Sequence, residues 1–206
     1  MLVVQVKGKE EILEASLRAP KILIIKCIGC REVYFPDSEV TDFIKELKNS
    51  TEIIDTLAVD YLCNLEFTKQ RIEKYKEKIN DSKSLLVFSC GIGVQTLSSV
   101  LEHKQIIAGC DTIYIKGFQG LTPNNRNCAA CNECWLNYTL GICPVTSCRK
   151  SLLNGPCGGA KNGKCEVDKE QDCAWNKIYE RLDKFRKVEN IIDKINIRDY
   201  LKVLKR

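Results

Sequence analysis

Cysteine is the residue type that could do chemistry in this chain. The 206 residues include 13 cysteines and a single histidine, His103. One histidine excludes a His-rich metal site, so the remaining chemistry is that of thiolates: zinc held by four cysteines, or iron–sulfur clusters. The odd number of cysteines argues against a closed disulfide framework. In a reducing cytosol, clustered cysteines are more often metal ligands or redox groups.

Eight of the cysteines form a block between residues 128 and 173. The segment CAACNEC has the spacing C-x2-C-x2-C, and GICP adds a cysteine followed by proline. Bacterial ferredoxins share this pattern with a shorter final gap, whereas zinc sites usually show two separated C-x2-C pairs. The spacing therefore favours iron–sulfur clusters, either two four-thiolate centres or one cluster and one zinc. The predicted ligands are Cys128, Cys131, Cys134, Cys143, Cys148, Cys157, Cys165 and Cys173.

Glycines follow one of these cysteines, Cys157. Gly158 and Gly159 are predicted to let backbone amides approach a cluster and adjust its potential. The same stretch, GGAKNGKC, matches the phosphate-loop pattern GxxxxGK, but Cys165 stands where Ser or Thr should hold magnesium. No strand is expected before it, so a nucleotide site is rejected. The sequence also shows no paired carboxylates and no Ser/His/Asp arrangement, and we predict no catalytic residue.

A second, sparser set of cysteines lies upstream of the block. Each of its members ends or follows a predicted strand of a parallel sheet. Because parallel strands bring their carboxyl ends to one edge of the sheet, where such folds bind ligands, the thiols are expected to meet there. The sequence predicts a four-thiolate metal site made of Cys27, Cys30, Cys63 and Cys90.

The turn CGIG, which begins at Cys90, is expected to open a helix. Free backbone N–H groups at a helix N-terminus stabilise negative charge on a sulfide or thiolate. Gly91 and Gly93 are therefore predicted to contact the cluster.

Three other interpretations of the upstream set are open. Cys27 and Cys30, in CIGC after a strand, could form a thioredoxin-like redox pair, although this leaves Cys63 and Cys90 without a role. GIGVQT could be half of a dinucleotide fingerprint, but it lacks the third glycine. The four cysteines could also be small buried hydrophobes, as we expect for Cys110 in the apolar segment QIIAGCDTIYI.

Strands and helices must alternate to position these thiols. Apolar runs of strand length and segments with helical spacing do alternate through the first half of the chain, which predicts an α/β fold with a Rossmann-like parallel sheet. The expected strands are 21–27, 53–59, 84–90 and one or two within 105–117, and the expected helices are 9–17, 37–49, 66–79 and 92–103.

The pattern changes after LTPNNRN, residues 121–127, which read as a linker. Residues 128–173 show no periodicity and cannot bury much apolar area, so metal ligation would have to order them. Helical spacing returns at Trp175. The predicted division is 1–121, an α/β domain with one four-cysteine site; 122–174, a Cys-rich iron–sulfur segment; and 175–206, an amphipathic basic tail with a C-terminal helix.

The net charge of +5 comes from the tail, where residues 174–206 hold ten Lys and Arg against five Asp and Glu. The tail's apolar residues recur at helical spacing, which indicates an amphipathic helix with a solvated or partner-docking face rather than a nucleic-acid site: Ile178, Leu182, Phe185 and Ile192. No apolar run approaches the roughly 20 residues that span a bilayer. The N-terminus lacks a signal-peptide core, so we expect a cytoplasmic protein without a transmembrane segment.

The run CWLNYTLGICPVTSCRKSLLNGPCGG, followed by GKCEVD and DCAWNKIYERL, resembles the methylenetetrahydrofolate reductase C-terminal domain family. This family is the small iron–sulfur subunit that pairs with a flavin-bearing catalytic subunit. The similarity is specific over residues 128–182 and looser over 20–120. It implies two or three [4Fe-4S] clusters on the cysteines of the block and of the upstream set. The folate and flavin sites would belong to the partner.

The resulting hypothesis is a non-catalytic electron-transfer and scaffold subunit of a methylenetetrahydrofolate reductase complex, in one-carbon metabolism and the reductive acetyl-CoA pathway. Several clusters would give one-electron stations, and the partner's flavin would convert them to a two-electron step. Further electron-transfer subunits could join the complex. Two alternatives stand: a structural zinc protein with a basic interaction tail, and a thiol redox protein using Cys27 and Cys30. The aromatic content of 7% counts against stacking on single-stranded nucleic acid.

Overall fold

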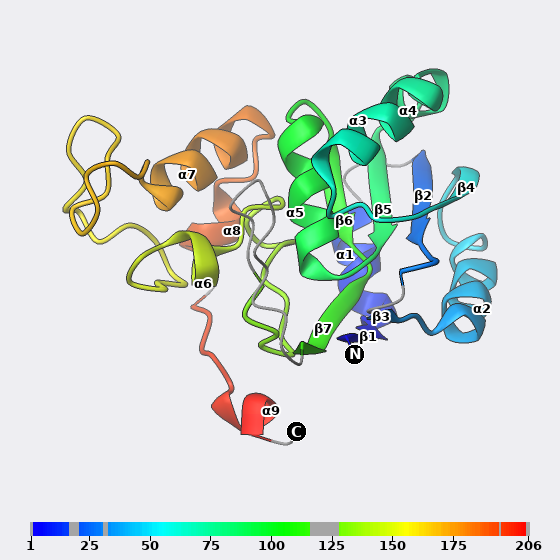
Figure 1. The fold of residues 1–206 in the computed structure, drawn as a ribbon, viewed down its shortest axis with the longest axis horizontal. Helices are drawn as coiled ribbons and strands as arrows, with labels where there is room; N and C mark the ends of the chain where they lie inside the picture. Colours follow the sequence, from blue (N-terminus) through cyan, green and yellow to red (C-terminus); the bar gives the residue numbers. More distant parts are fainter. Residues whose placement is uncertain (1, 17–20, 31–32, 116–127, 194, 205–206) are drawn as a thin grey trace.

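Four parallel strands form the central sheet of the protein, in the order β4-β2-β5-β6 (Figure 1). The computed structural model describes residues 2–16, 21–30, 33–115, 128–193 and 195–204. The predicted linker 121–127 lies outside these residues. The predicted α/β fold with a Rossmann-like sheet is confirmed. The strands are β2 (Ile22–Cys27), β4 (Ile53–Val59), β5 (Ser84–Phe88) and β6 (Gln105–Ala108).

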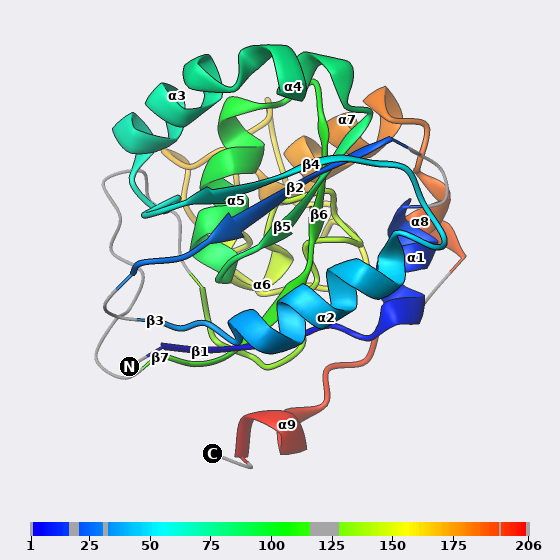
Figure 2. The ribbon, with the colours of Figure 1, turned by 90° about the vertical axis from the view of Figure 1, so that its right-hand side faces the viewer.

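Helices cover both faces of this sheet, as Figure 2 shows. Successive side chains of β2 point to opposite faces of the sheet and so contribute to two separate cores. Ile22 and Ile24 pack on one face, and Leu23 and Ile25 pack on the other. Strands that are buried on both faces have continuous apolar sequences, which is why KILIIKC could be predicted to form a strand. One face carries α1 (Lys9–Ser16) and α2 (Asp37–Leu47), and the other carries α3 (Leu65–Lys74), α4 (Lys76–Asp81) and α5 (Gly91–Val100).

A second, three-stranded sheet lies beside the first and has the order β3-β1-β7. Its strands are β1 (Leu2–Val6), β3 (Val33–Tyr34) and β7 (Cys110–Ile115), with β1 parallel to β3 and antiparallel to β7. Gly109 separates β6 from β7, and a Cβ there would lie 2.7 Å from the Phe88 ring. Residues 105–117 thus supply two strands to two different sheets. The sequence pattern did not predict β1 or β3.

The helix predicted over 66–79 is interrupted at Tyr75, whose φ of −110° and ψ of 20° end α3 and begin α4. The change of direction lets Ile72, Tyr75 and Ile79 all pack against the same core. The start of α3 is fixed by Asn64, whose side chain accepts a hydrogen bond from the Phe67 N–H at 3.1 Å.

Residues 128–173 are mainly irregular, with one short helix, α6 (Pro144–Ser147), and α7 (Ala174–Lys184) follows them. Trp175, Ile178 and Leu182 of α7 form a separate small core with Leu140. The predicted amphipathic helix therefore exists, but it ends at Lys184, and Ile192, which was expected on its apolar face, is 72% exposed. Two short helices follow, α8 (Glu189–Ile192) and α9 (Tyr200–Leu204).

Candidate metal centres

The upstream cysteines gather at the carboxyl edge of the central sheet. Cys27 is the last residue of β2, Cys63 lies in the turn between β4 and α3, and Cys90 is the N-cap of α5, directly after Ser89 and β5. Because β4, β2 and β5 are neighbours, their ends converge as the sequence predicted. We call Cys27, Cys30, Cys63 and Cys90 the first centre.

These four thiols lie close enough to influence one another's ionisation. Burial, with a further contribution from the charges of Cys90 and Cys63, raises the pKa of Cys27 to about 12. Burial raises the pKa of Cys63 to about 11, with Cys90 and Cys30 adding to the effect. Four thiolates cannot accumulate at one edge without a cation, because each charge opposes the next. The arrangement suits a site in which bound metal neutralises the thiolates.

The N-terminus of α5 faces the first centre. Burial raises the pKa of Cys90, whereas the backbone N–H groups of Gly93 and Ile92 act to lower it. Ser89 Oγ is buried and has no hydrogen-bond partner in the described part of the chain, although it lies near enough to Cys27 and Cys90 to lower their pKa values. A Cβ at Gly93 would overlap Ser89 Oγ. Gly93 therefore makes room for a hydroxyl that an anionic sulfur would satisfy.

A second set of four cysteines lines one small hollow, together with Gly91, Thr112 and Trp135. Burial raises the pKa of Cys128 to about 12 and that of Cys134 well above its ordinary value. The indole N–H of Trp135 is buried without a hydrogen-bond partner among the described residues, so the hollow also contains an unused donor. We call these cysteines the second centre: Cys128, Cys131, Cys134 and Cys143.

Gly91 separates the first centre from the second. The residue follows Cys90, and a Cβ built on it would lie 3.1 Å from the Cys128 Sγ atom. Its N–H donates to Thr112 Oγ1 at 2.9 Å, and Thr112 also acts to lower the pKa of Cys128. Gly91 was predicted to contact one cluster. The structure places it where the first and second centres approach each other closely.

Replacement of Gly91 by valine should lower the metal content of the second centre. The added methyl groups would have to displace Cys128, at a cost of about 1–3 kcal/mol for overpacking. Metal analysis and thermal unfolding of the anoxically purified variant measure the effect. Gly8→Val is the matched control, because nothing lies within 4 Å of a Cβ at Gly8. Equal metal content in both variants would contradict the close approach.

The remaining four cysteines of the block line another small hollow, beside Trp175. Cys157 is exposed, and its Sγ accepts a hydrogen bond from the Gly159 N–H at 3.4 Å, while Gly158 has a φ of +79°. The Gly159 amide thus lies beside a cysteine sulfur, and its approach to a cluster stays a prediction. We call Cys148, Cys157, Cys165 and Cys173 the third centre.

No residue between 146 and 173 is buried, although all of these residues are described. Within the segment, the contacts include two isolated antiparallel bridges, Lys161 with Lys164 and Lys164 with Asp172. They also include surface ion pairs such as Arg149–Asp168 and backbone hydrogen bonds such as the Cys173 N–H to the Gly163 carbonyl. Surface ion pairs contribute about 0–1 kcal/mol each, so they cannot offset the conformational entropy of ordering the segment. Metal ligation at the third centre would supply the missing free energy.

The arrangement of the cysteines bears on the kind of metal group. Among the described residues, no group of three or more His, Cys, Asp or Glu side chains is placed to hold a metal ion. A zinc site needs four sulfurs at about 2.3 Å from one atom, whereas an iron–sulfur cluster distributes its thiolates over several irons. Four cysteines that line one hollow without forming a single-ion group suit the larger group. The unpartnered donors of Ser89 and Trp135 fit sulfide and thiolate acceptors.

The structure also places residues at the centres that the sequence did not indicate. Ser89 and Trp135 contribute donors, and Thr112 bridges Gly91 and Cys128. Cys110 is 1% exposed within the main core, as expected of a cysteine that packs as a small hydrophobic residue. The order of residues in β7 offered a partial signal, because Asp111 and Thr112 are polar within an otherwise apolar strand.

The fold and the cysteine groups define an α/β protein with a cysteine-rich C-terminal half. Residues 107–201 match the protein family described as "Methylene-tetrahydrofolate reductase C terminal". The resemblance found in the sequence is thereby confirmed. Comparisons with curated proteins and with solved structures found no match. None of the helices that the structure describes has the length and apolar character required to cross a membrane.

Proposed function

We propose that this chain is the non-catalytic iron–sulfur subunit of a methylenetetrahydrofolate reductase complex, which passes electrons between a donor and the flavin of a catalytic partner. The observation that carries the proposal is the division of twelve cysteines into three groups of four, two of which lie within the matched residues 107–201. When bound, iron–sulfur clusters supply one-electron transfer. The partner's flavin would collect two such electrons for the two-electron reduction of its substrate.

The chain's own residues would hold and screen the clusters. Twelve thiolates would ligate them, the α5 N-terminus would offset negative charge at the first centre, and Ser89 and Trp135 would donate to sulfur. Because Gly91 brings Cys90 and Cys128 together, the first and second centres are adjacent, which suits transfer between them.

Anoxic purification tests the cofactor. We expect brown protein with iron, acid-labile sulfide and broad absorption near about 400 nm that decreases on reduction, as is general for this cofactor class. Colourless protein that contains only zinc would overturn the proposal.

Coexpression with a flavin-containing methylenetetrahydrofolate reductase subunit tests the partner. The two chains should copurify and the flavin should be reduced through this chain, whereas an unrelated flavoprotein should not copurify. A chain that stays monomeric beside the reductase subunit would count against the complex.

Zinc in the third centre is a second candidate, favoured by the absence of buried residues in 146–173. Structural zinc sites are closed four-ligand centres that contribute folding free energy directly. The metal that is lost from Cys165→Ser protein identifies the occupant: zinc for a structural centre, iron for a third cluster. Use of Cys27 as a redox nucleophile is disfavoured, because burial raises the pKa of its thiol to about 12, whereas reactive cysteines have lowered values.

A further inference from the structure

Lys7, directly after β1, is a buried lysine next to the second centre. Its side chain is 3% exposed. Lysine is almost never fully buried unless it is paired, because an unpaired ammonium group loses its hydration. Lys7 therefore needs partners whose interactions with its ammonium group offset the cost of burial.

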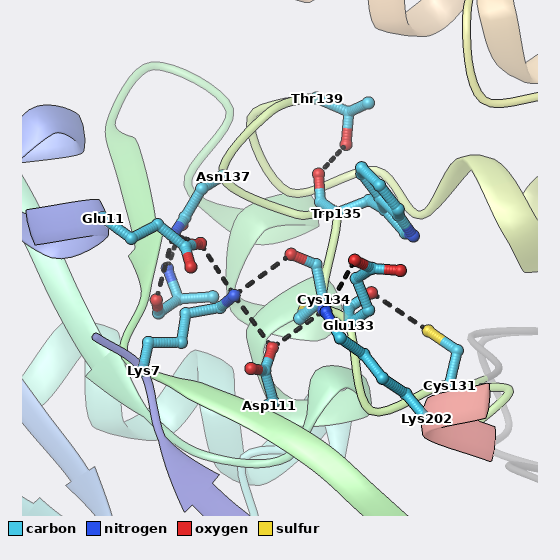
Figure 3. A network of polar contacts seen from close by, with 11 residues as sticks. Lys7, Glu11, Asp111, Cys131, Glu133, Cys134, Trp135, Asn137, Thr139 and Lys202 are labelled. Carbon is cyan, nitrogen blue, oxygen red and sulfur yellow. Dashed lines mark hydrogen bonds and ion pairs between the residues drawn. The ribbon is translucent and has the colours of Figure 1, made fainter. Parts of the chain in front are cut away.

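The partners of Lys7 converge on one cysteine of the second centre, as Figure 3 shows. The Lys7 Nζ donates to the Cys134 carbonyl oxygen at 3.2 Å and forms an ion pair with Asp111 at 2.8 Å. Asp111 in turn accepts a hydrogen bond from the Cys134 N–H at 2.8 Å. Both backbone polar groups of Cys134 are thus held by one ion pair.

The small sheet holds this ion pair in place. The Lys7 N–H donates to the Gly109 carbonyl at 3.0 Å, and Gln5 pairs with Asp111 across β1 and β7. Glu11, on α1, forms an ion pair with Lys7 at 2.7 Å but is half-exposed, with 46% of its side chain accessible. A ligand cysteine on an irregular segment is thereby anchored to regular structure.

The charges around the second centre are mainly negative. Four thiolates, Asp111, Glu11 and Glu133 stand against Lys7, Arg198 and Lys202, and only Lys7 is fully buried. A charge acts most strongly where solvent does not screen it. Net charge and hydrogen bonding set the potential of an iron–sulfur cluster, so a buried cation at this place favours the reduced form.

We propose that Lys7 is a positioning residue of the second centre: together with Asp111 it fixes Cys134, and its buried positive charge raises the reduction potential of the cluster bound there. The inference rests on the proposed function. With Lys7 present, the cluster of the second centre would have a higher reduction potential than its cysteine ligands alone would give it. The small sheet then has a role, since it carries Lys7 on one strand and Asp111 on the next.

Reductive titration of the full-length chain, purified anoxically with its clusters and monitored by electron paramagnetic resonance, tests the assignment. Lys7→Met should shift one cluster to lower potential, leave the others unchanged, and weaken retention of that cluster against a chelator by about 10-fold, as for other residues that orient metal ligands. Lys7→Arg should restore the potential. Lys9→Met is the control, because Lys9 pairs with Glu46 at the surface.

Asp111→Asn separates charge from anchoring, because asparagine keeps an acceptor for the Cys134 N–H but removes a negative charge. It should shift the same cluster to higher potential, opposite to Lys7→Met, whereas two variants that merely loosen the fold would not shift it in opposite directions. Unchanged potentials in Lys7→Met, or shifts of the same sign in both variants, overturn this inference alone. Wild-type protein without iron overturns the proposed function, and the inference with it.

Discussion

Removal of metal under anoxic, reducing conditions will expose residues 146–173 to trypsin and leave the central sheet protected. The segment has no buried residue, so we expect its order to depend on metal bound at the third centre. Binding free energies of about 10–16 kcal/mol are typical of structural zinc in small domains, and loss of such a term unfolds the segment. Cleavage after Lys161 and Lys164 should accelerate at least about 100-fold, since proteolysis follows the population of the open form.

The chain contains its own control for this experiment. Lys69 and Lys76, on α3 and α4, are as exposed as the lysines of the third centre, but their helices pack on the main core through Ile72 and Ile79. Their cleavage rates should change little when metal is removed. Mass spectrometry of the early fragments distinguishes the two sets. A metal-free protein, confirmed by elemental analysis, that still resists cleavage within 146–173 would show that something other than metal orders the segment.

Patterns that depend on local periodicity were sufficient to predict the central sheet. KILIIKC and SLLVFSC are apolar because both faces of β2 and β5 are covered, and their order along the chain fixed which strand ends meet. The convergence of Cys27, Cys63 and Cys90 followed from the single rule that parallel strands end at one edge. The ligand role of these residues stays a prediction.

Features that depend on distant contacts could not be predicted. β1 is stabilised by pairing with β7, more than 100 residues away, and Lys7 looks like any surface lysine until Asp111 and Cys134 lie beside it. The basic tail is not one helix, because its apolar residues beyond Val188 and Ile191 find no core, and Ile195 and Ile197 are more than 80% exposed. Helical spacing alone does not reveal where the packing surface ends.

Assignment of the eight C-terminal cysteines to centres is the other result that spacing could not give, because eight ligands can be combined in many ways. The structure separates them in chain order, the first four around one hollow and the last four around the other. The tight turn of CAACNEC brings its three thiols together, and Gly141 at a φ of +93°, held against Ser98, returns the chain so that Cys143 completes the set.

Serine in place of one cysteine of each group should therefore remove one centre at a time. Cys63→Ser, Cys131→Ser and Cys165→Ser should each lose the metal of a single centre, because serine is a poor ligand for iron and zinc at neutral pH and three thiolates do not complete a four-ligand site. Elemental analysis and spectra of the anoxic proteins measure the loss. Cys110→Ser is the matched control, since Cys110 is buried in the core and belongs to none of the three groups.

The double variant Cys131→Ser/Cys165→Ser decides whether the partition is right. If the second and third centres are separate, the two losses add, because the hollows share no lining residue. If cysteines from both halves of the block ligated one common centre, each single variant would already remove it and the double variant would lose nothing more. Additive loss, with Cys110→Ser at full metal content, would establish that the second and third centres bind metal independently.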